Sequence, residues 1–156
     1  MKILIAGDFS VQDRAERIIW NKSSLTEAFK GVQLLTEQCD YATVNLESPI
    51  TEADKLIVKD GPTLKNTEQV IEIIKYCGFD TVTLANNHLK DYGCQGVNDT
   101  ISLCKEKGIT IVGAGGNLAE ARKPLVLKKD GLSIGLLNVC EHESSIATAE
   151  SAGAAP

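Results

Sequence analysis

Short hydrophobic runs and helix-like repeats alternate along most of this chain. The runs at residues 2–6, 41–46, 81–85 and 109–112 are apolar or β-branched, and they predict buried strands. Between them, apolar residues recur at helical spacing and predict helices over about 24–38, from a cap at Asn66 to Cys77, and from the region of Val97 to Gly108. This alternation predicts βαβ crossovers, and so an α/β fold with a mostly parallel sheet flanked by helices.

Three further segments have weaker patterns. Leu56-Ile57-Val58 predicts a small edge strand, and the segment 18–20 predicts either a short helix or an ordered loop. Asp130-Gly131, between the apolar segments 125–128 and 132–139, is typical of a β-hairpin turn. We therefore expect one unit over 1–140, ending in this hairpin. Residues 141–156 are rich in Ala, Ser, Glu and Gly, and we expect a tail or an interrupted connection there.

Composition and charge narrow the function classes only slightly. The chain has 156 residues, 43% of them hydrophobic and 24% charged, which argues against disordered and fibrous proteins. A formal net charge of -5, without a basic stripe, argues against a nucleic-acid partner. No apolar run is long enough for a signal peptide or a membrane span, so the sequence as written predicts a cytoplasmic protein with no membrane segment. The oligomeric state is left open.

The five cysteines suggest neither a disulfide framework nor a zinc site. Their number is odd and no C-x-x-C pair occurs. We expect most of them to be reduced, small core residues.

Polar residues follow three successive predicted strands. They are Asp8 after the first strand, Asn45 and Glu47 at the end of the second, and Asn86-Asn87-His88 after the third. Since ligands bind outside the carboxyl ends of the strands of an open parallel sheet, we expect these residues to meet at one rim. Carboxylate, amide and imidazole groups suit Mn²⁺, Mg²⁺, Fe²⁺ or Zn²⁺.

This residue set predicts a metal-dependent hydrolytic site. Asp8 and Glu47 would hold one ion with an amide completing the shell, or two ions with Glu47 as the bridge. His88 would donate a proton to the leaving group or anchor it, and Asp91 is close enough along the chain to fix the His88 ring. A small molecule or a polymer is the expected substrate.

Ordinary structural roles compete with this interpretation. Asp8 could be a turn or cap residue, Glu47 an exposed loop carboxylate and His88 a surface histidine. Asn45 and Asn86 more often satisfy backbone groups in turns than they bind ligands. The glycine-rich loop 113–117 offers a third possibility, a phosphate cradle, but Leu118 stands where a dinucleotide fingerprint has its third glycine.

Five motifs resemble those of one family, and they follow its order over about residues 1–139. They are Gly7-Asp8, Asn45-Leu46-Glu47-Ser48-Pro49-Ile50-Thr51, Gly78-Phe79-Asp80, Leu84-Ala85-Asn86-Asn87-His88 with Asp91-Tyr92-Gly93, and Gly113-Ala114-Gly115. Together they resemble the poly-gamma-glutamate capsule biosynthesis (CapA-type) family, within the calcineurin-like metallophosphoesterase superfamily.

The resemblance implies a layered metallophosphoesterase-type fold with a dinuclear site for divalent metal ions at its strand ends. It implies that Asp8, Glu47 and Asn87 are metal ligands. It also implies that His88 is catalytic with Asp91 as its partner, and Asn45 and Asn86 remain candidates for binding substrate. The implied reaction is hydrolysis of a phosphoester or a gamma-glutamyl amide in the synthesis or processing of capsule polymer.

Two departures from the family pattern weaken the expected activity. Ser10 stands where the superfamily has the histidine of its Asp-x-His motif, although the CapA-type group generally shares this difference. The family's later histidine motifs have no counterpart, and His142 does not match them. We therefore expect the N-terminal part of a longer protein, with weak or absent catalysis. The alternatives are a non-catalytic component that binds or assembles polymer and a nucleotide-binding domain.

Overall fold

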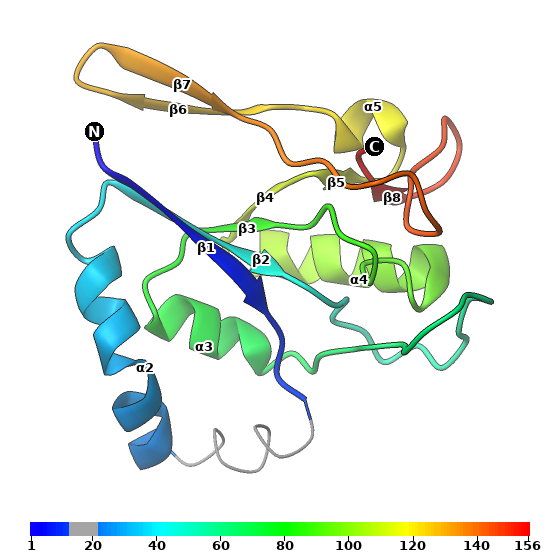
Figure 1. Cartoon of the computed structure of the whole chain (residues 1–156), viewed down its shortest axis with the longest axis horizontal. Coiled ribbons are helices and arrows are strands. Elements are labelled where there is room, and N and C mark those ends of the chain that lie inside the picture. The colour runs from blue at the N-terminus through cyan, green and yellow to red at the C-terminus, as the bar shows by residue number, and fades with distance from the viewer. Residues whose placement is uncertain (13–21) are drawn as a thin grey trace.

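The centre of the molecule is a four-stranded parallel sheet. The computed structural model describes residues 1–12 and 22–156, and its main strands are β1 (Ile3–Phe9), β2 (Tyr41–Leu46), β3 (Thr81–Thr83) and β4 (Thr110–Val112). They lie in the order β1-β2-β3-β4, so neighbours in the sheet are neighbours along the chain (Figure 1). The predicted α/β fold with a parallel sheet is confirmed.

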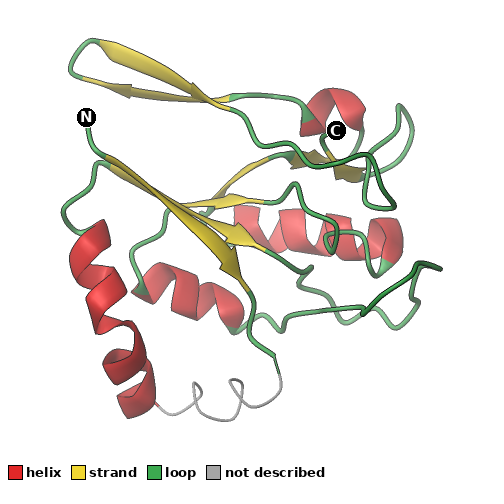
Figure 2. Ribbon diagram, in the orientation of Figure 1, coloured by secondary structure: helices red, strands yellow, loops and turns green. Residues whose placement is uncertain are grey.

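Three helices connect these strands and cover the sheet. They are α2 (Lys22–Thr36), α3 (Val70–Tyr76) and α4 (Gly93–Glu106), close to the predicted ranges. Right-handed crossovers taken in consecutive order place every helix on the same side of a sheet. Figure 2 shows the three helices along one side of the strands. Helix α3 buries Val70, Ile71, Ile73 and Ile74 almost completely against the strands, as its apolar spacing predicts.

The first strand is longer than predicted, and this changes the position of Asp8. We expected Asp8 just past the strand, but β1 continues to Phe9 because Asp8 pairs with Asn45 and Phe9 pairs with Leu46. The register between β1 and β2 shifts between Ile5 and Asp8. Such an irregularity bends the strand and changes the direction of the side chains that follow it.

The remaining elements lie on the other side of the sheet from α3 in Figure 1. The predicted hairpin is confirmed as β6 (Leu125–Lys129) and β7 (Leu132–Leu136). Its turn residues Asp130 and Gly131 have φ angles of 52° and 76°, the left-handed values of a type I′ turn. The Tyr41 hydroxyl donates to the Lys128 carbonyl oxygen at 2.7 Å and joins the hairpin to β2.

Part of the segment 141–156 is built into the fold. Its strand β8 (Gly153–Ala154) pairs antiparallel with β5 (Ala114–Gly115), beside the short helix α5 (Leu118–Ala121). Residues 145–147 and 152–155 are buried. This segment shows no core pattern in its sequence because small alanine and glycine residues make these contacts.

Two local predictions are wrong, and a third lies outside the described residues. Leu56-Ile57-Val58 forms no strand, and Val58 is fully exposed. Asn66 does not cap α3, whose N-cap is Gln69, because the Asn66 side chain is buried and bonded to other segments. The predicted short helix or loop at 18–20 lies in the range that the structure does not describe.

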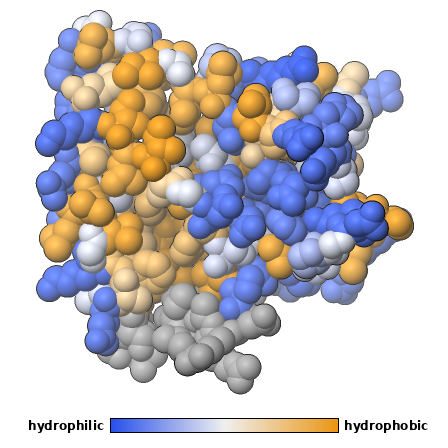
Figure 3. Space-filling view, in the orientation of Figure 1, coloured by the Kyte–Doolittle hydropathy of each residue, from blue (hydrophilic) through white to orange (hydrophobic). Residues whose placement is uncertain are grey.

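The surface has a hydrophobic region over β1 and the hairpin. Exposed apolar side chains there include Ile5 of β1 and Val126, Leu132 and Ile134 of the hairpin. Figure 3 shows hydrophobic residues gathered on the side of the molecule where these elements lie. Within the described residues, no helix is both long and apolar enough to cross a membrane.

The cysteines are unpaired, and two of them belong to the core. All five are free thiols, and Cys77 and Cys104 are buried. Burial raises the pKa of Cys77 to about 11 and that of Cys104 to about 12, so both stay protonated near neutral pH.

Gly113 is a glycine whose replacement the fold should tolerate poorly. Its φ is 90°, and an added Cβ would lie 2.2 Å from Oδ1 of Asn138. We expect Gly113→Ala to lower the free energy of unfolding by about 1–3 kcal/mol or more, from backbone strain and displacement of Asn138. Urea unfolding measures this effect. The control is Gly135→Ala, where a Cβ meets nothing within 4 Å; equal losses in both variants would contradict the prediction.

Candidate functional site

The carboxylate of Asp8 is fixed at the carboxyl end of β1 by the neighbouring strand. After the register shift in β1, Nδ2 of Asn45 donates to Oδ1 of Asp8 at 2.6 Å. Asp8 itself remains exposed to solvent. A short bond from an amide to a carboxylate orients the acid without neutralising its charge.

Amide side chains extend this contact across the sheet to the third strand. Oδ1 of Asn45 accepts from the Thr83 hydroxyl at 3.1 Å and from Nδ2 of Asn86 at 3.4 Å. Nδ2 of Asn86 also donates to the Leu46 carbonyl oxygen at 2.9 Å. Asp8, Asn45 and Asn86 therefore form one hydrogen-bonded row across β1, β2 and β3.

The row ends at the turn that carries His88. Oδ1 of Asn86 accepts from the backbone N–H groups of His88 and Leu89, both at 3.0 Å. Asn86 thus satisfies backbone groups in the turn, the ordinary role considered from the sequence. Contact of Asn45 or Asn86 with a substrate stays a prediction.

His88 and Asp91 form a buried pair. Nδ1 of His88 lies 2.8 Å from Oδ2 of Asp91, whose side chain is completely buried. Oδ2 also accepts from the Leu64 backbone N–H at 2.8 Å. His88 is only 7% exposed. The interaction at Nδ1 leaves Nε2 as the ring nitrogen for an external partner.

A lysine completes this cluster. Nζ of Lys59 pairs with the other oxygen of Asp91, and its side chain is 8% exposed. The same Nζ lies 3.2 Å from Nδ1 of His88 and donates to the Asn87 carbonyl oxygen at 3.4 Å. Lysine is rarely buried this deeply unless it is paired, so the Asp91 carboxylate accounts for its position.

The other two predicted ligands lie at the same end of the sheet. The backbone N–H of Glu47 donates to the Phe9 carbonyl oxygen at 3.1 Å, which places Glu47 beside the end of β1. Glu47 is partly buried, whereas Asn87 is exposed. The structure thus puts Asp8, Glu47 and the Asn87-His88 turn at the ends of three adjacent strands.

The available donors suit a divalent cation, but they are few. Asp8, Glu47 and Asn87 supply carboxylate and amide oxygens, which hard divalent ions prefer. Among residues 1–12 and 22–156, no three His, Cys, Asp or Glu side chains group closely enough to hold a metal ion. The chemistry of these donors fits a single ion with few protein ligands, and a metal role for them stays a prediction.

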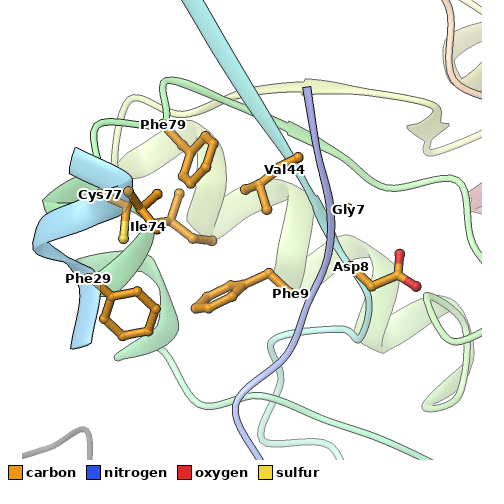
Figure 4. A pocket seen from close by; sticks show the side chains of 10 residues that line it. Gly7, Asp8, Phe9, Phe29, Val44, Ile74, Cys77 and Phe79 are labelled. Carbon is orange, nitrogen blue, oxygen red and sulfur yellow. The ribbon is translucent and has the colours of Figure 1, made fainter. Parts of the chain in front are cut away.

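An apolar cavity of about 160 Å³ lies next to Asp8 but does not belong to this site. Figure 4 shows Phe9 and Phe29 at the cavity, while the Asp8 carboxylate points away from it on the other side of β1. The two phenyl rings meet edge to face, with their centroids 6.1 Å apart. The cavity is therefore a gap in the packing between the sheet and helices α2 and α3.

The glycine-rich loop 113–117 makes close contacts with protein atoms. A Cβ at Gly113 would meet Asn138, and a Cβ at Gly115 would lie 2.4 Å from Cβ of Glu120. Asn117 caps α5 through a 3.0 Å bond from the Glu120 backbone N–H. These glycines are explained by packing within the chain, so nothing here favours a phosphate cradle.

Comparison with known proteins identifies the family of this chain. The family model described as "Bacterial capsule synthesis protein PGA_cap" matches residues 2–155. The chain belongs to this family. It is 28% identical to "Capsule biosynthesis protein CapA" of Bacillus anthracis over 98% of its length, and 30% identical to "PGA biosynthesis protein CapA" of Bacillus subtilis over 84%. It spans only 38% and 35% of the lengths of these two relatives.

The PGA_cap chain contains two site-forming residues that the sequence did not reveal. Lys59 lies in a polar connection, where a lysine normally extends into solvent. Asn66 resembled a helix cap, yet it is 2% exposed and bonded to segments elsewhere in the chain. Their contacts join residues 18–55 positions apart, and no local pattern reports such contacts.

Removing the Asp91 carboxylate should destabilise the fold strongly. Asp91→Ala would leave Lys59 buried without its partner, and we expect a loss of about 3–5 kcal/mol in the free energy of unfolding. Urea unfolding would show it. Asp54→Ala is the matched control, because the Asp54 side chain is 99% exposed and its pair with Lys65 is worth at most about 1 kcal/mol. A loss in Asp91→Ala no larger than the control's would contradict the buried pair.

Proposed function

We propose that this PGA_cap chain carries a metal-dependent hydrolytic site that acts in the synthesis or processing of a capsule polymer. The observation that supports it most is the row from Asp8 through Asn45 and Asn86 to the His88 turn. That row brings an exposed carboxylate and a carboxylate-bound histidine to one edge of a parallel sheet. The substrate is a phosphoester or a gamma-glutamyl amide.

Asp8, Glu47 and the Asn87 side chain would hold the divalent ion. The chemistry supplied by such an ion is polarisation of a phosphoryl or carbonyl oxygen and activation of water. Asn45 holds the Asp8 carboxylate in place, so little reorganisation is needed when a cation arrives. Only two of the three proposed ligands, Asp8 and Glu47, are carboxylates, so we expect weak metal affinity.

His88 would transfer the proton. Its Nδ1 is engaged by Asp91, which leaves Nε2 to give a proton to the departing oxygen or nitrogen of the substrate. Asp91 and the Asn86 amide fix the ring and the backbone of His88 respectively. At 7% exposure little of His88 is open to solvent, so a substrate has limited access to it.

The low exposure of His88 favours a second function. A non-catalytic component for polymer binding or assembly would need the fold and its rigid rim, but would not need proton transfer by His88. Turnover separates the two functions, since only the first requires it.

Metal binding is the first test of the proposal. We expect calorimetric titration with Mn²⁺ to show binding by the wild-type chain and none by Asp8→Ala, because Asp8 supplies an exposed ligand oxygen. Asp80→Ala is the control, since Asp80 precedes β3 and so lies at the opposite end of the strands. Identical titrations of wild type and Asp8→Ala would remove Asp8 as a ligand.

Hydrolysis is the second test. With Mn²⁺ present, we expect slow turnover of a generic phosphodiester, reduced about 10²–10⁴-fold in His88→Ala by loss of the proton donor. His142→Ala is the matched control, because His142 is the only other histidine and is exposed. Turnover that survives in His88→Ala would reject His88 as the proton donor. Metal binding without turnover in the wild type would favour the non-catalytic function.

A further inference from the structure

The connection from β2 to α3, which we call the 51–66 loop, is long and has no helix or strand between Thr51 and Lys65. Such long connections are uncommon in compact domains and are usually functional or disordered. This one makes specific contacts along its length. It begins at Thr51, whose hydroxyl donates to Asp99 of α4. It ends at Asn66, which is buried among the ends of the first two strands.

The middle of the 51–66 loop contacts the His88 half of the site. The Ile57 backbone N–H donates to the Asp91 carbonyl oxygen at 3.0 Å, and the Leu64 N–H donates to the Asp91 carboxylate. Lys59 pairs with the same carboxylate and reaches the Asn87 carbonyl oxygen. Three positions of one loop thus converge on the residue that orients His88.

The end of the 51–66 loop contacts the Asp8 half. Oδ1 of Asn66 accepts from the Val11 backbone N–H at 2.9 Å, and its Nδ2 donates to the Ser48 hydroxyl at 2.6 Å. The Ser48 hydroxyl lies 3.1 Å from that of Ser10. Val11 and Ser10 follow β1, and Ser48 follows Glu47. Asn66 therefore joins the two chain segments that carry Asp8 and Glu47.

We propose that the 51–66 loop positions both halves of the candidate site, Lys59 acting on the Asn87-His88 turn and Asn66 on the ends of β1 and β2. Neither side chain is proposed to touch substrate or metal. A buried amide with donor and acceptor both satisfied, and a buried lysine with its carboxylate, each have few alternative arrangements. They are thus suited to hold site residues in fixed positions. The test below has two measurements. The Mn²⁺ affinity measurement rests on the proposed function, whereas the hydrogen-exchange measurement of positioning does not.

The test uses two variants with chemically matched controls. Lys59→Met removes the ammonium at similar length, and Lys55→Met makes the same change at an exposed position of the loop. Asn66→Asp replaces the amide donor by an oxygen, and Asn98→Asp does so on the exposed side of α4. Lys59→Arg keeps the cation and serves as the rescue variant.

Amide hydrogen exchange, followed by NMR, measures how well each backbone N–H group is protected at these positions. We expect Lys59→Met to speed exchange at least tenfold at the N–H groups of Ile57, Leu64 and Asp91. Asn66→Asp should do so at Glu47, next to the Ser48 contact that it removes, whereas Val11 keeps an acceptor oxygen. The amides within α4 should keep wild-type rates, as should all amides in the controls, and Lys59→Arg should restore most of the protection. Equal acceleration in α4 would show a general loss of stability. No acceleration beyond the controls would show that these residues do not hold the site. Either result would overturn the proposal.

Mn²⁺ affinity, measured where each variant is folded, provides the second readout. Residues that orient ligands typically change metal affinity 10–100-fold, and we expect a loss in this range for both variants and none for the controls. Unchanged affinity in both would overturn the proposal. If the wild type binds no Mn²⁺, the proposed function fails, and the exchange rates still decide the positioning role. If Lys59→Met does not fold, Asn66→Asp and Lys59→Arg decide it.

Discussion

The completely buried carboxylate of Asp91 constrains the arrangement of this PGA_cap chain around His88. A charge removed from water costs several kcal/mol unless it is paired and hydrogen-bonded, and three residues do this for Asp91: Lys59 by an ion pair, and Leu64 and His88 by hydrogen bonds. The first two lie in the 51–66 loop and the third lies in the turn after β3. Satisfying one carboxylate therefore holds a long loop without secondary structure against the turn that carries His88.

The parallel sheet provides the second constraint, because it brings the ends of consecutive strands together. Asp8 and Asn45 lie in β1 and β2, Asn86 follows β3, and their hydrogen bonds cross the sheet at one edge. The side-chain amides of Asn45 and Asn86 each have a donor and an acceptor, so their hydrogen bonds link the Asp8 carboxylate to the His88 backbone. The register shift in β1 contributes to this arrangement, because it precedes Asp8 and changes the direction of the strand there.

The sequence predicted what depends on local pattern and missed what depends on distant contacts. The strand at 41–46, the helix core at Val70–Ile74 and the Asp130-Gly131 turn follow from burial periodicity and turn geometry. β1 extends to Phe9 because its last residues pair with β2, and the residues of β1 alone do not reveal this pairing. The site residues at strand ends could be named because topology places strand ends together. Lys59 and Asn66 could not, because a lysine in a polar loop and an asparagine before a helix have commoner explanations.

The buried cluster of Lys59, Asp91 and His88 bears on the choice between catalysis and polymer handling. Buried ion pairs are weak sources of stability, and well-packed apolar residues of similar volume often replace them at no cost. A rim needed only for its shape could therefore be built from apolar side chains. The cluster instead engages Nδ1 of His88 and leaves Nε2 for another partner, which is what proton transfer or ligation requires and what passive binding does not. Chemistry at His88 explains this cluster better than stability does, and on this ground the hydrolytic function is the stronger of the two.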